Sequence, residues 1–287
     1  MRAEALLNTL QPVVAYYDHT WIDYRLIWLN ERNLAIHFGY DDGRARSHAE
    51  SLLNTNRVMA DLADIRCGDR VLDAGCGVAG SSIWLAENRG ATVVGITPVA
   101  SQVDIARSKL ANRGLTESLA VTQADYTATG FPARSFDVVW ALESVCHAAR
   151  KADFYRESAR LLRSDGRLVV AEYVRADRPM SFEHEGLLRD WLDGWMIPDL
   201  DTAEEHRRHA HTAGFTDVEV RDVTSNMRRS LRRLYALSLL GVPIGRVLHA
   251  LGLRGEVLQG NVTGSRNQYL ALRRDCWHYA MITARKP

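Results

Sequence analysis

The feature that most constrains this 287-residue chain is the run Val71–Gly80, which reads Val-Leu-Asp-Ala-Gly-Cys-Gly-Val-Ala-Gly. It starts like a buried strand, stops at Asp73 and continues through a glycine-rich turn into a helix. Gly75, Gly77 and Gly80 leave out side chains where the backbone must bend sharply and approach a ligand. Backbone amides at the start of the helix can then hold a polar or anionic group. The run therefore predicts a nucleoside-binding turn between a strand and a helix.

The same glycine spacing also fits the fingerprint of a dinucleotide-binding turn, so other residues must decide the cofactor. A dinucleotide site needs an acidic residue about 20 positions further on, where the second strand ends. That strand is expected over 92–96, and it ends at Thr97-Pro98 without an acid. Asp73 instead precedes the glycines, where an acid suits a positively charged ligand such as S-adenosylmethionine. We therefore favour this methyl donor over a nicotinamide cofactor and over a turn that binds nothing.

Strand-like and helix-like segments alternate along most of the chain, which is typical of a parallel sheet with helices on both faces. A final segment, 277–284, alternates between apolar and polar residues like a last strand. We expect an α/β, Rossmann-like fold with a mostly parallel sheet of seven strands. The other expected strands are 70–73, 92–96, 119–123, 136–141, 166–174 and 216–223, and the expected helices are 47–64, 81–88, 100–112, 152–162 and 203–213.

The regions before, within and after this alternation lead us to expect four parts. They are an aromatic N-terminal arm or cap, a cofactor-binding core, a helical lid and the last strand of the core, over 1–43, 44–227, 228–274 and 275–287. The leucines of the lid fit ordinary core, the wall of an apolar pocket or, because four arginines stand nearby, a helix on a membrane surface. Gly241, Pro243 and Gly245 disperse its apolar residues and disfavour the membrane-surface alternative.

Composition and charge exclude several kinds of site. The formal net charge is +1, so no strong field attracts nucleic acid. The four cysteines have neither the spacing of a zinc ribbon nor that of a disulfide framework. The histidines at 206, 209 and 211 do not share one helix face, so no metal site is expected. Without a signal peptide or an apolar run of about 20 residues for a membrane span, we expect a cytoplasmic protein.

Four motifs together resemble the class I S-adenosylmethionine-dependent methyltransferases. They are Asp73–Gly80, the Gly-Ile-Thr-Pro of 95–98 with Gln102, the Gln-Ala-Asp of 123–125 and the Phe-Asp-Val-Val-Trp of 136–140, within a resemblance over residues 45–223. The Gly-Ile-Thr motif and the Glu-Ser-Val-Cys-His of 143–147 are similar to small-molecule C-methyltransferases. The chain looks most like bacterial prenyl C-methyltransferases, which act on geranyl or farnesyl diphosphate or on terpenoid indoles, and more distantly like sterol C-methyltransferases.

The resemblance implies a cofactor role for eight residues. Asp73, Gly75 and Gly77 would contact the methionine half of S-adenosylmethionine, and Leu142 would lie near the sulfonium. Thr97 and Gln102 would contact the ribose, and Asp125 and Tyr126 the adenine. Glu143, next in the chain to Leu142, would also lie near the sulfonium.

Methylation of an alkene carbon also requires a proton acceptor. An alkene is a weak nucleophile, and its attack on the sulfonium methyl leaves a carbocation from which one proton must be removed. Glu172 is our preferred base, because a carboxylate within an apolar strand is costly unless it is paired or works in a pocket. Glu143 and His147 are its rivals, and a paired core glutamate is the alternative without a catalytic role.

Aromatic rings can stabilise such a carbocation without reacting with it, although ordinary packing is the alternative for each ring. Arg150 is the candidate clamp for a diphosphate, which Mg²⁺ would accompany, and its alternative is a surface arginine. The candidate residues of the acceptor pocket are Tyr17, Trp21, Trp191 and Trp195, beside the further aromatic residues Tyr16, Tyr24 and Trp28.

The expected function is S-adenosylmethionine-dependent C-methylation of an isoprenoid alkene, followed by proton loss or cyclisation. Two alternatives stay open: an O- or N-methyltransferase of a small secondary metabolite, and a cofactor-binding protein without methyl transfer, such as a pericyclase. The expected partner is a small apolar molecule rather than nucleic acid. The aromatic arm could also pack against a second copy of the chain in a homo-oligomer.

Overall fold

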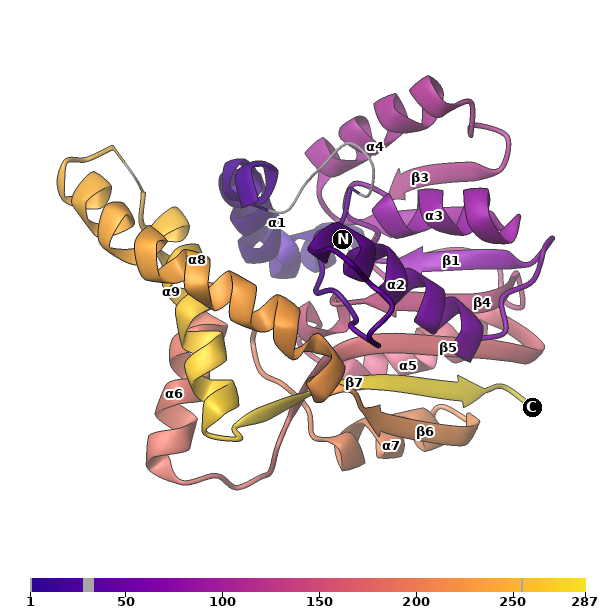
Figure 1. The fold of residues 1–287 in the computed structure, drawn as a ribbon. Coiled ribbons are helices and arrows are strands. Elements are labelled where there is room, and N and C mark those ends of the chain that lie inside the picture. The colour runs from indigo at the N-terminus through magenta and orange to yellow at the C-terminus, as the bar shows by residue number, and fades with distance from the viewer. Residues whose placement is uncertain (1, 28–33, 254) are drawn as a thin grey trace.

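A computed structural model describes residues 2–27, 34–253 and 255–287, and at its centre lies one sheet of seven strands (Figure 1). The strand order is β3-β2-β1-β4-β5-β7-β6; β7 pairs antiparallel with β5 and β6, whereas the other pairs are parallel. This confirms the predicted fold class, including the last strand. The strands are β1 Arg70–Ala74, β2 Thr92–Thr97, β3 Leu119–Gln123, β4 Phe136–Leu142, β5 Leu162–Arg175, β6 Thr216–Asp222 and β7 Trp277–Arg285.

Helices cover both faces of the sheet because successive residues of a strand point to opposite sides. Val71 and Val93 pack on the face with α2, α3 and α4, whereas Leu72 and Val139 pack on the face with α5 and α7. Each of these helices lies close to its expected range. They are α2 His48–Leu62, α3 Gly80–Arg89, α4 Ala100–Arg113, α5 Lys151–Leu161 and α7 Ala203–Thr212.

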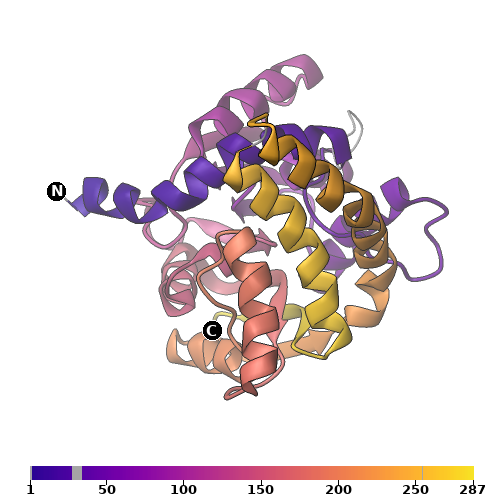
Figure 2. The same cartoon turned by 90° about the vertical axis from the view of Figure 1, so that its left-hand side faces the viewer.

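Helices α1, α6, α8 and α9 gather at the edge where the parallel strands end (Figures 1 and 2). Helices α8 and α9 form a hairpin, and α9 also packs against α1 and α6. Among the helices that the structure describes, none combines the length and the apolar composition that a membrane crossing needs. The bounds are α1 Arg2–Ile27, α6 Phe182–Gly194, α8 Thr224–Ala250 and α9 Glu256–Arg273.

The region expected to be a lid, 228–274, consists mainly of this hairpin. Helix α8 begins before that region, at Thr224, and continues through Pro243 without a break. The alternation of strands and helices predicted neither α6 nor a single long helix α1. The division of the chain into four parts stays a prediction.

Candidate active site

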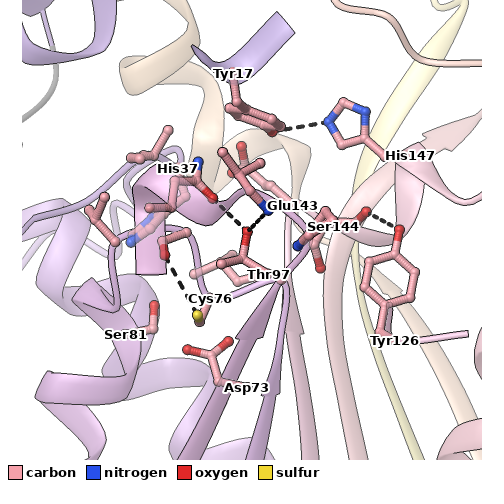
Figure 3. A pocket seen from close by; sticks show the side chains of 18 of the residues that line it. Tyr17, His37, Asp73, Cys76, Ser81, Thr97, Tyr126, Glu143, Ser144 and His147 are labelled. Atoms are coloured by element: carbon pink, nitrogen blue, oxygen red, sulfur yellow. Dashed lines mark hydrogen bonds between the residues drawn. The ribbon is translucent and has the colours of Figure 1, made fainter. Parts of the chain in front are cut away.

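Two adjoining cavities lie at the carboxyl ends of the strands, where loops leave the sheet and ligands bind in open α/β folds. The first cavity measures about 870 Å³ and the second about 810 Å³, with their open mouths included. Figure 3 looks into the first cavity, with Tyr17 at its top and Asp73 at its floor.

The first cavity brings together the eight residues predicted to hold the cofactor. They come from the carboxyl ends of β1, β2 and β4, from the loops after β1 and β3, and from helix α4. The parallel pairing places these strand ends at one edge, which is why residues far apart in sequence share the cavity. They are Asp73, Gly75, Gly77, Thr97, Gln102, Asp125, Tyr126 and Leu142.

Asp73 is a buried carboxylate at the floor of this cavity. Its Oδ2 accepts a hydrogen bond of 2.5 Å from the Ser82 hydroxyl, but its removal from water outweighs this contact and raises the pKa of Asp73 to about 7. An anion in such surroundings gains most from a cation. The ammonium of S-adenosylmethionine is a cation of this kind, so the donor set fits this cofactor.

The glycine turn has a steric reason for its sequence. Gly75 has a φ of +94°, and a Cβ at this position would lie 2.3 Å from Cβ of Ser144. The Ser144 hydroxyl in turn donates to the Ala74 carbonyl oxygen at 2.6 Å, which holds the loop after β4 against the turn. A side chain at 75 would therefore push apart the two loops that form the cavity.

Short hydrogen bonds also fix the side chains along the other walls. The Thr97 hydroxyl donates to Oε1 of Gln102 at 2.6 Å. The Tyr126 hydroxyl donates to the carbonyl of Ser144 at 2.9 Å, as Figure 3 shows. Oδ1 of Asp125 accepts from the backbone amide of Thr127 at 2.7 Å. These polar groups are held in place before any ligand arrives.

Five residues line both cavities and form what we call the shared wall: Tyr17, Ile36, His37, Glu143 and His147. A group bound in one cavity meets a group bound in the other at this wall. Any transfer between the two cavities must therefore take place beside these side chains.

Glu143 is the one carboxylate of the shared wall, and three donors hold it. Its Oε1 accepts from the Tyr279 hydroxyl and the Phe38 amide, both at 2.7 Å, and its Oε2 accepts from the Tyr173 hydroxyl. Burial nevertheless raises the pKa of Glu143 to about 7. Its own φ of +50° is uncommon for a residue with a side chain, and such strain collects at functional sites.

Tyr17 and His147 face each other across the top of the shared wall (Figure 3). The Tyr17 hydroxyl and Nε2 of His147 are 3.0 Å apart. Burial lowers the pKa of His147 to about 4, so the imidazole is neutral at neutral pH, and burial raises the pKa of Tyr17 well above its usual value. The pair is thus uncharged.

His37 is a member of the shared wall that sequence reasoning missed. Its Nδ1 lies 3.0 Å from the Phe38 carbonyl oxygen, which can only accept, so Nδ1 carries the proton. Burial lowers the pKa of His37 to about 4, and Nε2, which is buried, has no hydrogen-bond partner in the described part of the chain. The sequence offered no motif at this position, because 36–38 is a loop whose place depends on distant segments.

The second cavity is mostly aromatic and apolar, with a polar end. Tyr16, Tyr24, Phe38, Tyr173 and Trp195 are among its lining residues, and the inner face of α8 supplies further apolar ones. At the polar end, the Tyr16 hydroxyl donates to Oδ1 of Asn261 at 2.7 Å, and Nδ2 of Asn261 donates to Oδ2 of Asp23 at 2.9 Å. Among the lining residues that the structure describes there is no lysine or arginine.

Glu172, the base that the sequence favoured, lies outside both cavities. Its Oε2 accepts from the Cys146 amide at 2.8 Å and its Oε1 from the Tyr173 amide at 2.9 Å. The carboxylate therefore supports the backbone after β4 rather than facing a ligand. Of the two rival glutamates, Glu143 is the one that lines the cavities.

Three of the five predicted acceptor-binding residues also lie elsewhere, whereas Tyr17 and Trp195 do line the second cavity. Trp191 is fully buried and packs against Trp277, and Trp21 packs on the edge of the same core. Arg150 is exposed at the start of α5, where it pairs with Asp153 at 3.1 Å. Arg150 therefore lines neither of the two cavities. Trp28 lies outside the described residues.

A family model described as a methyltransferase domain matches residues 72–170 of the chain. The 27-O-demethylrifamycin SV methyltransferase of Amycolatopsis mediterranei (strain S699) is 27% identical over 253 residues, which cover 88% of this chain and 90% of that protein. Other curated relatives reach 34% or 35% identity, but there the chain spans only 50% to 60% of the relative's length.

Solved structures show the same fold. The [4+2]-cyclase SpnF has a TM-score of 0.78 at 23% identity, with 96% of this chain and 95% of that chain covered. A geranyl diphosphate methyltransferase in complex with GPP and sinefungin has a TM-score of 0.75 at 17% identity, with 97% of this chain and 100% of that chain covered.

Proposed function

Since this chain belongs to the class I S-adenosylmethionine-dependent methyltransferases, we propose that it methylates an alkene carbon of an uncharged isoprenoid acceptor. The observation that carries the proposal is the shared wall, where one buried carboxylate, Glu143, stands between the first cavity and the aromatic second cavity. The acceptor would occupy the second cavity.

The first cavity would hold the cofactor through groups that are already in place. Asp73 would bind the ammonium, Thr97 and Gln102 the ribose hydroxyls, and Asp125 the adenine amino group. When bound, S-adenosylmethionine supplies an electrophilic methyl group. The chain's own part is to hold the acceptor's double bond at the shared wall and to exclude water from it.

The second cavity suits an acceptor that becomes positively charged as it reacts. The faces of aromatic rings attract a cation by about 0.5–2 kcal/mol each and do not add to it. Glu143 would then accept the departing proton at Oε2, which receives one hydrogen bond whereas Oε1 receives two. Its pKa of about 7 leaves it ionised above neutral pH and able to take up that proton.

The charges of the second cavity favour a prenylated neutral compound over a free diphosphate. The charged side chains among its described lining residues are the carboxylates of Asp23 and Glu143. A diphosphate is bound by arginine, lysine or a metal ion, and it would be repelled by two carboxylates. With no diphosphate to chelate it, Mg²⁺ has no role in this proposal.

O-methylation is the second candidate, and His37 is the observation that favours it. A neutral imidazole with a free lone pair on Nε2 can accept the proton of a hydroxyl at the shared wall. The relative from Amycolatopsis carries an O-demethylated substrate in its name, and it is matched over most of its length.

Incubation with S-adenosylmethionine labelled in its methyl group tests both candidates. The acceptor panel contains neutral prenylated aromatics, geranyl and farnesyl diphosphates, and hydroxylated macrocycles. We expect label on carbon of a neutral prenylated compound, located by NMR. Label on oxygen would establish the second candidate, transfer only to the diphosphates would refute the neutral acceptor, and binding without any transfer would leave a cofactor-dependent cyclase.

A further inference from the structure

The outer face of α8 carries an exposed apolar stripe. Leu240, Ile244, Val247 and Leu251 follow one another at intervals of three or four residues, and each is between 58% and 69% exposed. Side chains at this spacing lie on one side of a helix. Large exposed apolar patches on a folded protein mark a surface that meets something else.

This stripe exists because α8 does not break. The sequence led us to expect that Gly241, Pro243 and Gly245 would scatter the apolar residues, and instead the helix runs through all three to Ala250. The inner side of the same helix, with Leu234 and Ser238, lines the second cavity. One helix therefore separates the second cavity from the apolar stripe.

The charge of α8 indicates what covers the stripe. The helix contains five arginines, at 228, 229, 232, 233 and 246, and no aspartate or glutamate. Arg233 and Arg229 stand seven and eleven residues before Leu240, so they continue the line of the stripe toward the start of the helix. Both are exposed, and Arg229 also pairs with Asp41 at 3.4 Å.

We propose that this face of α8 docks on an anionic lipid bilayer and lies in the plane of its surface. An apolar stripe beside arginines is the pattern of helices that lie at a membrane interface. Two copies of a helix with positive charges alone repel each other, which disfavours self-association through the same face. An anionic bilayer can bind both the stripe and the arginines, since the stripe enters its acyl region and the arginines pair with its headgroups.

Docking would place the wall of the second cavity at the membrane. This consequence rests on the proposed function, because an isoprenoid acceptor partitions into lipid and would reach the second cavity from there. The docking itself needs no acceptor and no methyl transfer, so it can be measured separately.

Sedimentation of the full-length protein with lipid vesicles tests the proposal. One set of vesicles is phosphatidylcholine alone and the other contains phosphatidylglycerol. We expect binding to the anionic vesicles that weakens as salt rises from about 0.1 M to about 1 M, because the Debye length then falls to about 3 Å. Equal binding to both vesicle types, or none to either, would overturn the proposal.

Two sets of substitutions separate the contributions of the stripe and the arginines. The triple change Leu240→Gln, Ile244→Gln and Val247→Gln is expected to abolish vesicle binding. The double change Arg229→Gln and Arg233→Gln, at the two arginines in line with the stripe, is expected to weaken binding to anionic vesicles about 30-fold, from the contribution of an arginine near such a surface.

Phe182→Gln is the matched control, because Phe182 is 95% exposed on α6 and lies outside the stripe. This variant should bind vesicles like the wild type, and circular dichroism should show that every variant is folded. If light scattering shows that the triple variant breaks up an oligomer, and the wild type does not bind vesicles, the stripe is an interface between copies and the proposal fails.

Discussion

Replacing Glu143 and Glu172 by glutamine, one at a time, separates a catalytic carboxylate from a structural one. Burial raises the pKa of each carboxyl to about 7, so the two are alike in chemistry. They differ in place, because Glu143 lies in the shared wall and Glu172 lies outside both cavities. A positioned general base contributes about 10²–10⁴-fold in rate. We expect Glu143→Gln to lose activity by about that factor and Glu172→Gln to keep most of it.

The variant expected to lose more activity, Glu143→Gln, is also expected to be the more stable one, and the sign of this effect follows from the pKa values. A carboxyl whose pKa is higher in the folded chain than in the unfolded chain favours folding when protonated, so stability falls as pH rises from about 4.5 to about 7. Above pH 7 the ionised form of each glutamate costs about 3 kcal/mol. Glutamine removes this cost at either position.

The hydrogen-bond donors around each carboxylate determine how much stability each glutamine variant gains. Both oxygens of Glu172 accept backbone amides, and a glutamine has one oxygen, so one amide loses its partner at a cost of about 1–3 kcal/mol. At Glu143 the donor to Oε2 is the Tyr173 hydroxyl, which can rotate and accept from the glutamine amide instead. Glu143→Gln should therefore be the more stable variant above pH 7.

Three measurements check this reasoning: methyl transfer from labelled cofactor, cofactor affinity by calorimetry, and urea unfolding. The wild-type rate should rise with pH through about 7 as Glu143 ionises, and this rise should be absent from the residual rate of Glu143→Gln. The reasoning is refuted if Glu172→Gln is as inactive as Glu143→Gln while it folds and binds cofactor normally, or if Glu143→Gln is fully active.

Three further outcomes test other parts of the site. Asp73→Asn should weaken cofactor binding in calorimetry by about 10- to 100-fold, since hydrogen bonds to charged groups contribute about 1.5–3 kcal/mol. The same change should raise the stability of the ligand-free protein above pH 7, because the pKa of Asp73 is about 7. Unchanged affinity would contradict the ammonium site. Gly75→Ala should lower the melting temperature and abolish cofactor binding, because its Cβ would meet Ser144 at 2.3 Å; normal binding would show that the two loops can separate. Tyr17→Phe removes the hydroxyl that lies 3.0 Å from Nε2 of His147. Because one net hydrogen bond is lost, methyl transfer should slow about fivefold while cofactor affinity stays unchanged. A change in affinity alone would place Tyr17 in cofactor binding.

The first cavity could be predicted from the sequence because its residues belong to short local motifs. The turn at Gly75, the strand end at Thr97 and the acid at Asp125 each follow a strand that the apolar pattern reveals. The parallel order of β1 and β2 then brings these ends together without any further information. Local patterns and sheet topology thus explain why these residues meet, and their expected cofactor roles came from the family resemblance.

The second cavity could be predicted only in part, through Tyr17, Trp195 and leucines of the lid, because its walls come from segments that no local pattern connects. The contact between Tyr16 and Asn261 joins residues 245 positions apart. Glu143 and Glu172 also looked equivalent, since both stand near the ends of neighbouring strands. Glu143, which lines both cavities, has a left-handed backbone with φ of +50°, and the sequence carries no signal for it.

The hydrogen bond between Tyr16 on α1 and Asn261 on α9 joins the first helix of the chain to the last one. The residues predicted to hold the methyl donor all lie between 73 and 142, whereas the far wall of the second cavity comes from residues before 25 and after 233. The segment after residue 233 thus contributes to the second cavity and not to the first. Exchanging the segment after residue 233 for that of a relative would change the choice of acceptor and keep every residue that lines the first cavity.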